Sequence, residues 1–142
     1  MAKIPEALQQ HINGAFPANV CLVGTVGKDG FPNVSPKGSV LVLDDETLAY
    51  WERSKRKAWD NVQNGSKVVI YFRNPELRQT LLPAGAIARF YGTATVHESG
   101  AIRDQVWDKV IEPEKKPDPE KKGAAIVVKI ERAEHLNGKP LE

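Results

Sequence analysis

The sequence has little of what marks secreted, membrane-spanning or metal-binding proteins. Its single cysteine, Cys21, excludes a disulfide within the chain and is typical of a reducing compartment. No stretch approaches the roughly 20 apolar residues that a membrane-spanning helix needs, and residues 1–6 lack the apolar core of a secretory signal. The three histidines are far apart in the chain, without cysteine or carboxylate residues at ligand spacing. We therefore expect a cytoplasmic protein that neither enters a membrane nor holds a metal ion.

A large excess of charge of one sign is also absent. Twenty lysine and arginine residues face eighteen aspartate and glutamate residues, which gives a formal net charge of only +2. The chain as a whole is therefore not a polyelectrolyte binder, and local clusters of charge matter more than the total. The glycine-rich signatures of Rossmann and P-loop nucleotide sites are missing as well. The one cysteine lies inside an apolar stretch, so we interpret it as a small buried hydrophobe rather than a nucleophile.

The pattern of apolar residues favours strands over helices. Patterns typical of strands or hairpins cover residues 20–35, 39–43, 47–51, 67–73, 85–97 and 124–130. Helical patterns cover residues 5–13, 54–64 and 100–111. A chain of 142 residues has the size of one domain, so we predict a single domain over residues 1–142. The predicted fold class is α+β but mainly β, with six to seven antiparallel strands in a closed or nearly closed barrel and two to three helices.

Three segments carry specific expectations about burial. The largely apolar run Ala124–Ile130, which only Lys129 interrupts, predicts a strand that is buried on both faces. Ile102, Val106 and Val110 recur at helical spacing and are predicted to form one buried stripe. Residues 112–122 contain three prolines and four charges of each sign, which predicts an exposed loop outside the core.

The most informative feature is a short basic run. In Arg53–Lys57 four of the five residues are cationic, and the run falls where a predicted strand ends and a predicted helix begins. A helix N-terminus favours anions, so cations there are unfavourable by roughly a few tenths of a kcal/mol each unless a bound anion offsets them. The run therefore predicts a phosphate site. The alternatives are a merely solvated run or a nucleic-acid patch, although no extended basic and aromatic face accompanies it.

A second cationic element precedes this run in the chain. In a strand, Lys37 and Ser39 share one face, and Gly38 between them permits a close approach of a ligand to the backbone. If this segment pairs with the strand that ends at Trp51, Lys37 and Ser39 converge with the basic run on one anion. Trp51 and Trp59 flank the run and are either an aromatic wall of the site or part of the core.

Taken together, these features resemble the pyridoxamine 5′-phosphate oxidase-like flavin-binding split barrels. The residues that carry the resemblance are spread over most of the chain, and their order and spacing match the family: residues 26–36, 50–51, 55–58, 61–62, 68–72, 89–94 and 125–130. The resemblance implies an antiparallel split barrel that binds FMN at the interface of a homodimer.

The resemblance also implies which residues bind the cofactor. The family's Ser-Arg-Lys phosphate motif falls on Lys55, Arg56 and Lys57, with lysine in place of the serine; its Tyr-Thr pair beside the ribityl phosphate falls on Tyr50 and Trp51, with the threonine lost. Ser54 is a candidate for the missing hydroxyl. The strand whose backbone runs beside the flavin ring corresponds to residues 37–40, which are Lys37, Gly38, Ser39 and Val40.

One departure bears on activity. The oxidases proper continue into a carboxy-terminal segment whose arginine and histidine grip the substrate phosphate, whereas residues 135–142 do not resemble it. We therefore expect an FMN-dependent oxidoreductase of unknown substrate and not a pyridoxine-phosphate oxidase. The alternatives are a non-enzymatic flavin carrier or stress-associated binding protein, or a barrel that binds deazaflavin or haem. The sequence singles out no catalytic acid or base.

Overall fold

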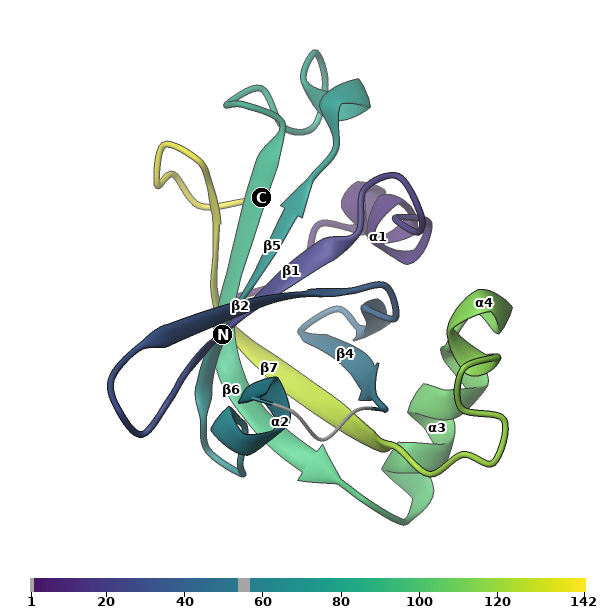
Figure 1. The fold of residues 1–142 in the computed structure, drawn as a ribbon. Coiled ribbons are helices and arrows are strands. Elements are labelled where there is room, and N and C mark those ends of the chain that lie inside the picture. Colours follow the sequence, from purple (N-terminus) through teal and green to yellow (C-terminus); the bar gives the residue numbers. More distant parts are fainter. Residues whose placement is uncertain (1, 54–56) are drawn as a thin grey trace.

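The computed structural model describes residues 2–53 and 57–142, with all their side chains except those of Lys57 and Ala58. The strands are β1 (Cys21–Val26), β2 (Pro32–Lys37), β3 (Leu41–Asp44), β4 (Thr47–Glu52), β5 (Lys67–Arg73), β6 (Ile87–His97) and β7 (Ala124–His135). The helices are α1 (Glu6–Asn13), α2 (Lys57–Asn61), α3 (Ala101–Lys109), α4 (Glu112–Lys115) and the short 3-10 helix η1 (Pro75–Leu77). Figure 1 shows the strands at the centre of the molecule, with α3 and α4 together on one side. Among the described residues, no helix combines the length and apolar character needed to cross a lipid bilayer.

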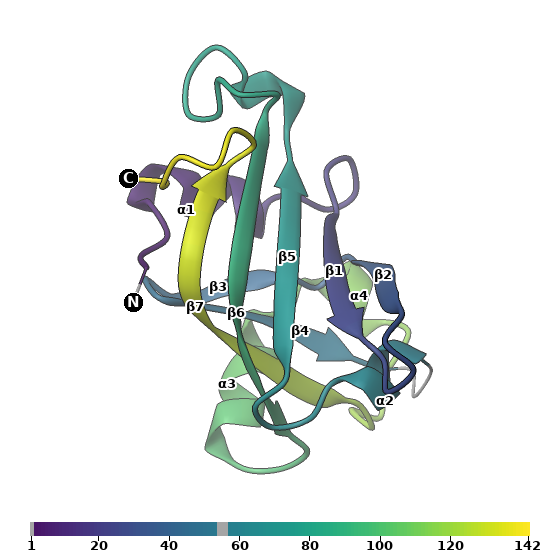
Figure 2. The ribbon, with the colours of Figure 1, turned by 90° about the vertical axis from the view of Figure 1, so that its left-hand side faces the viewer.

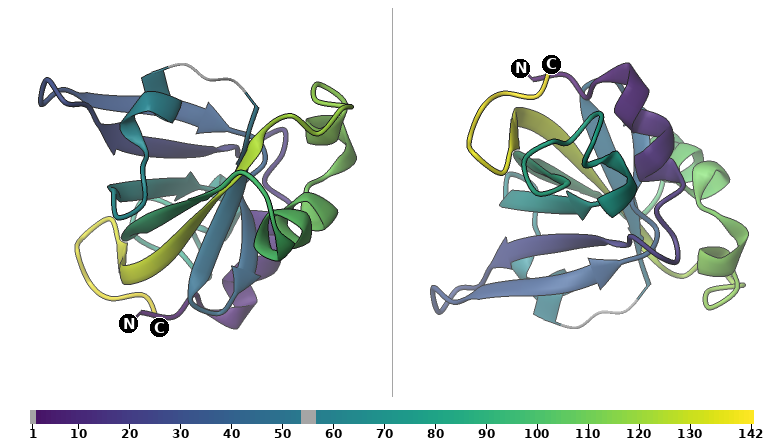
Figure 3. Two further views of the ribbon diagram at one scale, coloured as in Figure 1. Left: turned by 90° about the horizontal axis from the view of Figure 1, so that it is seen from below. Right: turned by 90° about the horizontal axis from the view of Figure 1, so that it is seen from above.

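The strands form one antiparallel sheet in the order β2-β1-β5-β6-β7-β4-β3, so β2 and β3 are its edges. The long strands β6 and β7 pair along most of their length and bend together at a register shift beside Gly92. The sheet curls around its core, as Figures 2 and 3 show, so that the end of β2 comes close to the end of β4. The predicted fold class, a mainly β antiparallel split barrel, is confirmed.

Two apolar clusters hold the fold together. The larger one fills the barrel with residues such as Tyr50, Phe72 and Phe90, and α1 closes one end of it. The smaller one lies outside the sheet, where α3 packs Val106 and other apolar residues against β4 and β7. Because β7 contributes to both clusters, Ala124–Val128 is covered on both faces, which confirms the expectation for this part of the strand; Lys129 is exposed.

Cys21 lies at the start of β1 with its side chain in the larger cluster. It is 1 % exposed, and this burial raises the pKa of its thiol to about 12. The thiol therefore stays protonated at neutral pH and has little nucleophilic character. The interpretation of Cys21 as a buried hydrophobe is confirmed.

Two expectations about burial are wrong. Ile102 on α3 is 42 % exposed, so the buried stripe is limited to Val106 in this helix and Val110 directly after it. Residues 112–122 are not a wholly exposed loop, since they begin with α4 and Asp118 is buried. The charge of Asp118 is tolerated there because its carboxylate accepts hydrogen bonds from an indole and two backbone amides.

The observed elements also differ from the predicted ranges. β7 continues five residues beyond Ile130, because its second half pairs with the first half of β6. The helix predicted over 54–64 ends at Asn61, and residues 54–56 lie outside the described residues. The pairing of residues 35–39 with β4, considered above as one way to bring Lys37 and Ser39 to the basic run, does not occur: β2 pairs with β1, and β3 pairs with β4.

Candidate functional site

A small cavity lies where the ends of β2 and β4 meet. Eight of the described residues line it, and we refer to it as the β2–β4 cavity: Pro36, Lys37, Gly38, Ser39, Trp51, Glu52, Arg53 and Glu114. Its volume is about 270 Å³. Four of the residues predicted to bind the cofactor therefore come together here, although β2 and β4 are not paired.

Ser39 joins the two segments through its side chain. Its hydroxyl accepts a hydrogen bond from the backbone N–H of Trp51 at 2.9 Å and donates one to the carbonyl of the same residue at 3.2 Å. The serine thus takes the place of a strand partner at the end of β4, where β3 no longer pairs. The hydroxyl is buried and already used within the chain, so its main effect is to fix the backbone beside the cavity.

Lys37 is the cation that β2 brings to the cavity. Its Nζ lies 3.0 Å and 2.8 Å from the two carboxylate oxygens of Glu52, and the two side chains are only 14 % and 3 % exposed. A buried pair of this kind is costly to break, because the remaining partner is left with an uncompensated charge. Any anion in the cavity would therefore share Lys37 with Glu52.

Gly38 is packed tightly from two sides. A Cβ atom at this position would lie 2.9 Å from the ring of Phe16 and 2.9 Å from the carboxyl carbon of Glu114. A larger side chain therefore requires these groups to move. Among the described residues, the groups that approach the backbone of Gly38 closely are thus side chains of the protein, those of Phe16 and Glu114.

Two of the predicted residues point elsewhere. Tyr50 is fully buried in the barrel core, and its hydroxyl has no hydrogen-bond partner among the described residues. Burial, and secondly the nearby charge of Glu52, raise the pKa of Tyr50. Val40 is likewise buried in the barrel core. The side chains of these two residues are not part of the β2–β4 cavity.

Trp51 faces the other way from Tyr50 and is held by a segment that the sequence analysis placed outside the core. Its indole N–H donates to Asp118 at 2.8 Å, and its ring lies 4.7 Å from that of Trp107. The guanidinium of Arg103 lies 5.0 Å from the Trp51 ring. The tryptophan that replaces the family's threonine is therefore a buried structural residue whose edge reaches the cavity.

We call residues 111–123 the strap. Asp118 anchors it by accepting hydrogen bonds from Trp51 and from the amides of Lys122 and Gly123, at 2.9 Å and 2.8 Å. Burial acts to raise the pKa of Asp118, but these hydrogen bonds and the charge of Arg103 outweigh it, so the pKa lies below its ordinary value. The sequence gives little sign of this anchor, because Trp51, the hydrogen-bond partner of Asp118, lies 67 residues earlier in the chain.

The predicted phosphate clamp falls largely outside the described part of the chain. Ser54, Lys55 and Arg56 are not described, and Lys57 is described only as the first residue of α2. Arg53 is exposed at the cavity. The clamp therefore stays a prediction.

The position of α2 itself is well fixed at its far end. Asn61 donates a hydrogen bond from its side-chain amide to the buried hydroxyl of Thr25 on β1 at 3.1 Å. Val62 enters the barrel core directly after the helix, and Trp59 packs against the same core. Of the two interpretations of Trp59, packing in the core therefore fits the structure better than an exposed aromatic wall.

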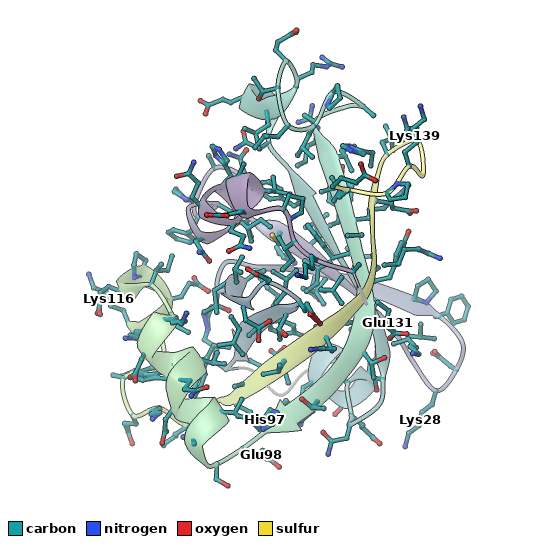
Figure 4. The ribbon with its side chains drawn as sticks, turned by 180° about the vertical axis from the view of Figure 1, so that it is seen from behind. Lys28, His97, Glu98, Lys116, Glu131 and Lys139 are labelled. Atoms are coloured by element: carbon teal, nitrogen blue, oxygen red, sulfur yellow. The ribbon has the colours of Figure 1, made fainter. Side chains whose placement is uncertain are left out.

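A second hollow of different character lies on the outside of the barrel. This outer groove has a volume of about 450 Å³ and is lined by residues of β1, β2, β5, β6 and β7: Gly24, Thr25, Val26, Pro32, Val34, Lys67, Val68, Val69, Tyr91, Gly92, Glu131 and Arg132. Val26 and Val34 are 59 % and 63 % exposed. Figure 4 labels Glu131 on β7, on the side of the barrel from which the β1–β2 hairpin with Lys28 extends.

Comparison with known proteins gives a consistent picture. The family model described as Pyridoxamine 5′-phosphate oxidase matches residues 4–137. The structure of HupZ from Group A Streptococcus is 26% identical with a TM-score of 0.73, covering 98% of this chain and 98% of that one. A proposed pyridoxamine 5′-phosphate oxidase from Lactobacillus delbrueckii is 30% identical with a TM-score of 0.64, covering 94% and 99%.

A more distant similarity is one of fold alone. An FMN-binding protein from Syntrophomonas wolfei has a TM-score of 0.63 at 14% identity, covering 90% of this chain and 83% of that one. No curated protein sequence matches the chain.

Proposed function

Because the chain belongs to the pyridoxamine 5′-phosphate oxidase family, we propose that it is an FMN-binding flavoprotein that acts as an oxidoreductase. The observation that carries the proposal is the family match over residues 4–137, and two further points support it. The β2–β4 cavity gathers Lys37, Gly38, Ser39 and Trp51 directly before the predicted phosphate clamp. A protein of the same fold is described as FMN-binding.

The residues at this cavity suit the phosphate end of the cofactor better than its ring. Ligand pockets for whole cofactors span about 300–1,000 Å³, whereas the β2–β4 cavity has about 270 Å³. Among its charged residues, Lys37 and Arg53 suit a phosphate, and its polar groups suit the adjoining hydroxyl-bearing chain, whereas the carboxylates of Glu52 and Glu114 oppose a negative charge. We propose that Arg56 and Lys57 neutralise the phosphate, with help from Ser54 and Lys37, and that Arg53 and Lys55 add positive charge beside it.

Redox chemistry in such a protein belongs to the flavin when it is bound, and the chain supplies position and electrostatics. Ser39 fixes the backbone of β4 through its two hydrogen bonds to Trp51. Asn61 fixes the end of α2 against β1 and thereby restricts the position of the start of this helix, where Lys57 lies. The buried pair of Lys37 and Glu52 keeps a cation near the cavity without leaving an uncompensated charge in the absence of ligand.

The ring requires a surface beyond this cavity, and we propose that a second copy of the chain provides it. The outer groove exposes Val26 and Val34, and Phe31 at the hairpin is 72 % exposed. Large apolar side chains clustered at the surface mark association sites. The groove also carries both signs of charge, Lys67 and Glu131, as the self-complementary surface of a two-fold dimer requires. We place this dimer in the cytoplasm, in keeping with its single buried thiol.

Purification tests the proposal directly. The protein is expected to be yellow, or to become yellow with added FMN, and to release flavin on denaturation. A colourless protein that fails to take up FMN contradicts the proposal, and the spectrum of a bound deazaflavin or haem would redirect it. Anaerobic reduction of the bound flavin by a nicotinamide cofactor separates an oxidoreductase from a flavin carrier. Size-exclusion chromatography with light scattering tests the dimer.

A further inference from the structure

We propose that Glu114 is a specificity-determining residue of the β2–β4 cavity, which weakens the binding of a ligand according to the negative charge that the ligand places there. The inference rests on the proposed function, because the cavity is the one assigned to the phosphate end of the cofactor. It concerns a residue in the strap that the family resemblance does not single out.

The first observation is the place of the Glu114 side chain. It lines the cavity together with Lys37 and Arg53, and its carboxyl group packs against the backbone of Gly38. Among the described residues, no hydrogen bond or ion pair satisfies this carboxylate. It is half-buried, so water screens its charge less than that of a fully exposed group.

The second observation is that the strap holds Glu114 in this place. Asp118, four residues further on, is tied to Trp51 and to the amides of Lys122 and Gly123. Arg103 on α3 donates to the carbonyl of Gly123 at 2.9 Å and 3.2 Å and also to that of Lys121. These buried hydrogen bonds therefore restrain the backbone that carries Glu114 beside the cavity.

The third observation is the charge balance of the cavity. Lys37 and Glu52 compensate each other, which leaves Glu114 and the exposed Arg53 as the other charged residues of the described lining. A phosphate in this space meets a carboxylate of like charge, whereas a hydroxyl or amide N–H of a ligand finds a hydrogen-bond acceptor. Glu114 is thus expected to favour hydroxyl-bearing ligands without phosphate relative to the same ligands with phosphate.

The test compares Glu114→Gln with a matched control, Glu120→Gln. Both changes remove one negative charge from the strap while keeping the shape of the side chain. Glu120, however, is 74 % exposed, pairs with Lys122 at 3.4 Å and does not line the cavity. Binding of FMN, riboflavin and inorganic phosphate is measured by calorimetry for the three proteins. Riboflavin lacks the phosphate, so it reports on any change that is not electrostatic.

Glu114→Gln is expected to tighten FMN binding about tenfold, as the removal of one like charge within a few ångströms predicts. Inorganic phosphate should bind more tightly as well, riboflavin should change by less than about twofold, and high salt should shrink the difference. Glu120→Gln is expected to leave all three affinities unchanged.

The proposal is overturned if FMN affinity stays constant or falls in Glu114→Gln, or if riboflavin and FMN gain equally. If no form of the protein binds either flavin, the proposed function fails, and the phosphate titration alone decides about Glu114. Tighter phosphate binding in Glu114→Gln supports the inference in that case. No phosphate binding by any of the three proteins overturns it.

Discussion

The β2–β4 cavity and the outer groove lie on the same barrel, but their side chains differ in whether they already have partners within the chain. In the cavity, the chain pairs its own polar groups: Lys37 with Glu52, and Ser39 and Asp118 with Trp51. In the groove, apolar side chains such as Val34 face the outside. The cavity is therefore preorganised before any ligand arrives, whereas the groove gains most from a partner that covers it.

The same contrast holds for two ion pairs of nearly equal length. Lys37 and Glu52 lie 2.8 Å apart with side chains that are 14 % and 3 % exposed. Lys67 and Glu131 lie 2.9 Å apart, but their side chains are 72 % and 46 % exposed. Distance alone thus does not decide what a pair contributes; burial does, because it sets the cost of leaving one partner alone.

The largest effect is expected from breaking the buried pair. Glu52→Ala leaves the Lys37 ammonium buried without a counter-charge and should lower the free energy of unfolding by about 3–5 kcal/mol. The matched change Glu131→Ala at the exposed pair should cost less than about 1 kcal/mol. Urea denaturation at equal protein concentration measures both. Equal losses in the two variants would contradict the distinction between the regions.

The next effect concerns the anchor of the strap. Asp118→Ala removes the acceptor of three hydrogen bonds and leaves the Trp51 indole and two amides unpaired, which should cost about 3 kcal/mol. Glu120→Ala, on the exposed side of the strap, serves as the control and should cost close to nothing. Fluorescence of the tryptophans during thermal unfolding reports the change.

Asp118 also gives the strap a dependence on pH. Its folded-state pKa lies below the unfolded value, so the group stabilises the fold above the unfolded pKa of about 4, and this contribution is lost as pH falls through the folded pKa. Asp118→Asn should therefore flatten the fall in stability below about pH 4. An acid-unfolding profile that is unchanged in this variant would show that other carboxylates dominate.

The contrast between the two regions was only partly predictable from the sequence. Alternation of apolar residues identified the strands of the barrel, and the double burial of Ala124–Val128 followed from its lack of polar residues. The cavity residues Lys37 and Ser39 were found from their shared face. Their contacts to Glu52 and Trp51 were not, because β2 and β4 meet through side chains rather than strand pairing.

The strap shows why local composition was insufficient. Its prolines and balanced charges describe a solvated loop correctly for most positions. Asp118 is the exception, since its burial depends on an indole that lies 67 residues earlier in the chain. Glu114 likewise cannot be distinguished in the sequence from the other three acidic residues of this stretch, and only the fold brings it to Gly38.

A further prediction tests whether the predicted clamp binds the phosphate. Arg56→Ala and Lys57→Ala should each weaken FMN binding by about 1.5–3 kcal/mol, the contribution of one charged hydrogen bond, and should leave riboflavin binding nearly unchanged. Arg78→Ala, at an exposed arginine after η1, provides a control of equal charge. FMN affinity that is unchanged in both clamp variants would mean that the phosphate is held elsewhere.

The smallest expected effect addresses the outer groove. Val34→Glu places a charge at a 63 % exposed apolar position of the groove, and if a second copy covers this face the dimer should dissociate at about tenfold higher concentration. Ile102→Glu makes the same kind of change at a 42 % exposed residue on α3, outside the groove, and should leave the dimer intact. Both are measured by light scattering across a dilution series.

Because Val34 does not line the β2–β4 cavity, phosphate affinity should stay constant while association weakens. Loss of phosphate affinity in Val34→Glu would instead mean that the cavity is completed by the partner, so that the two regions act as one site.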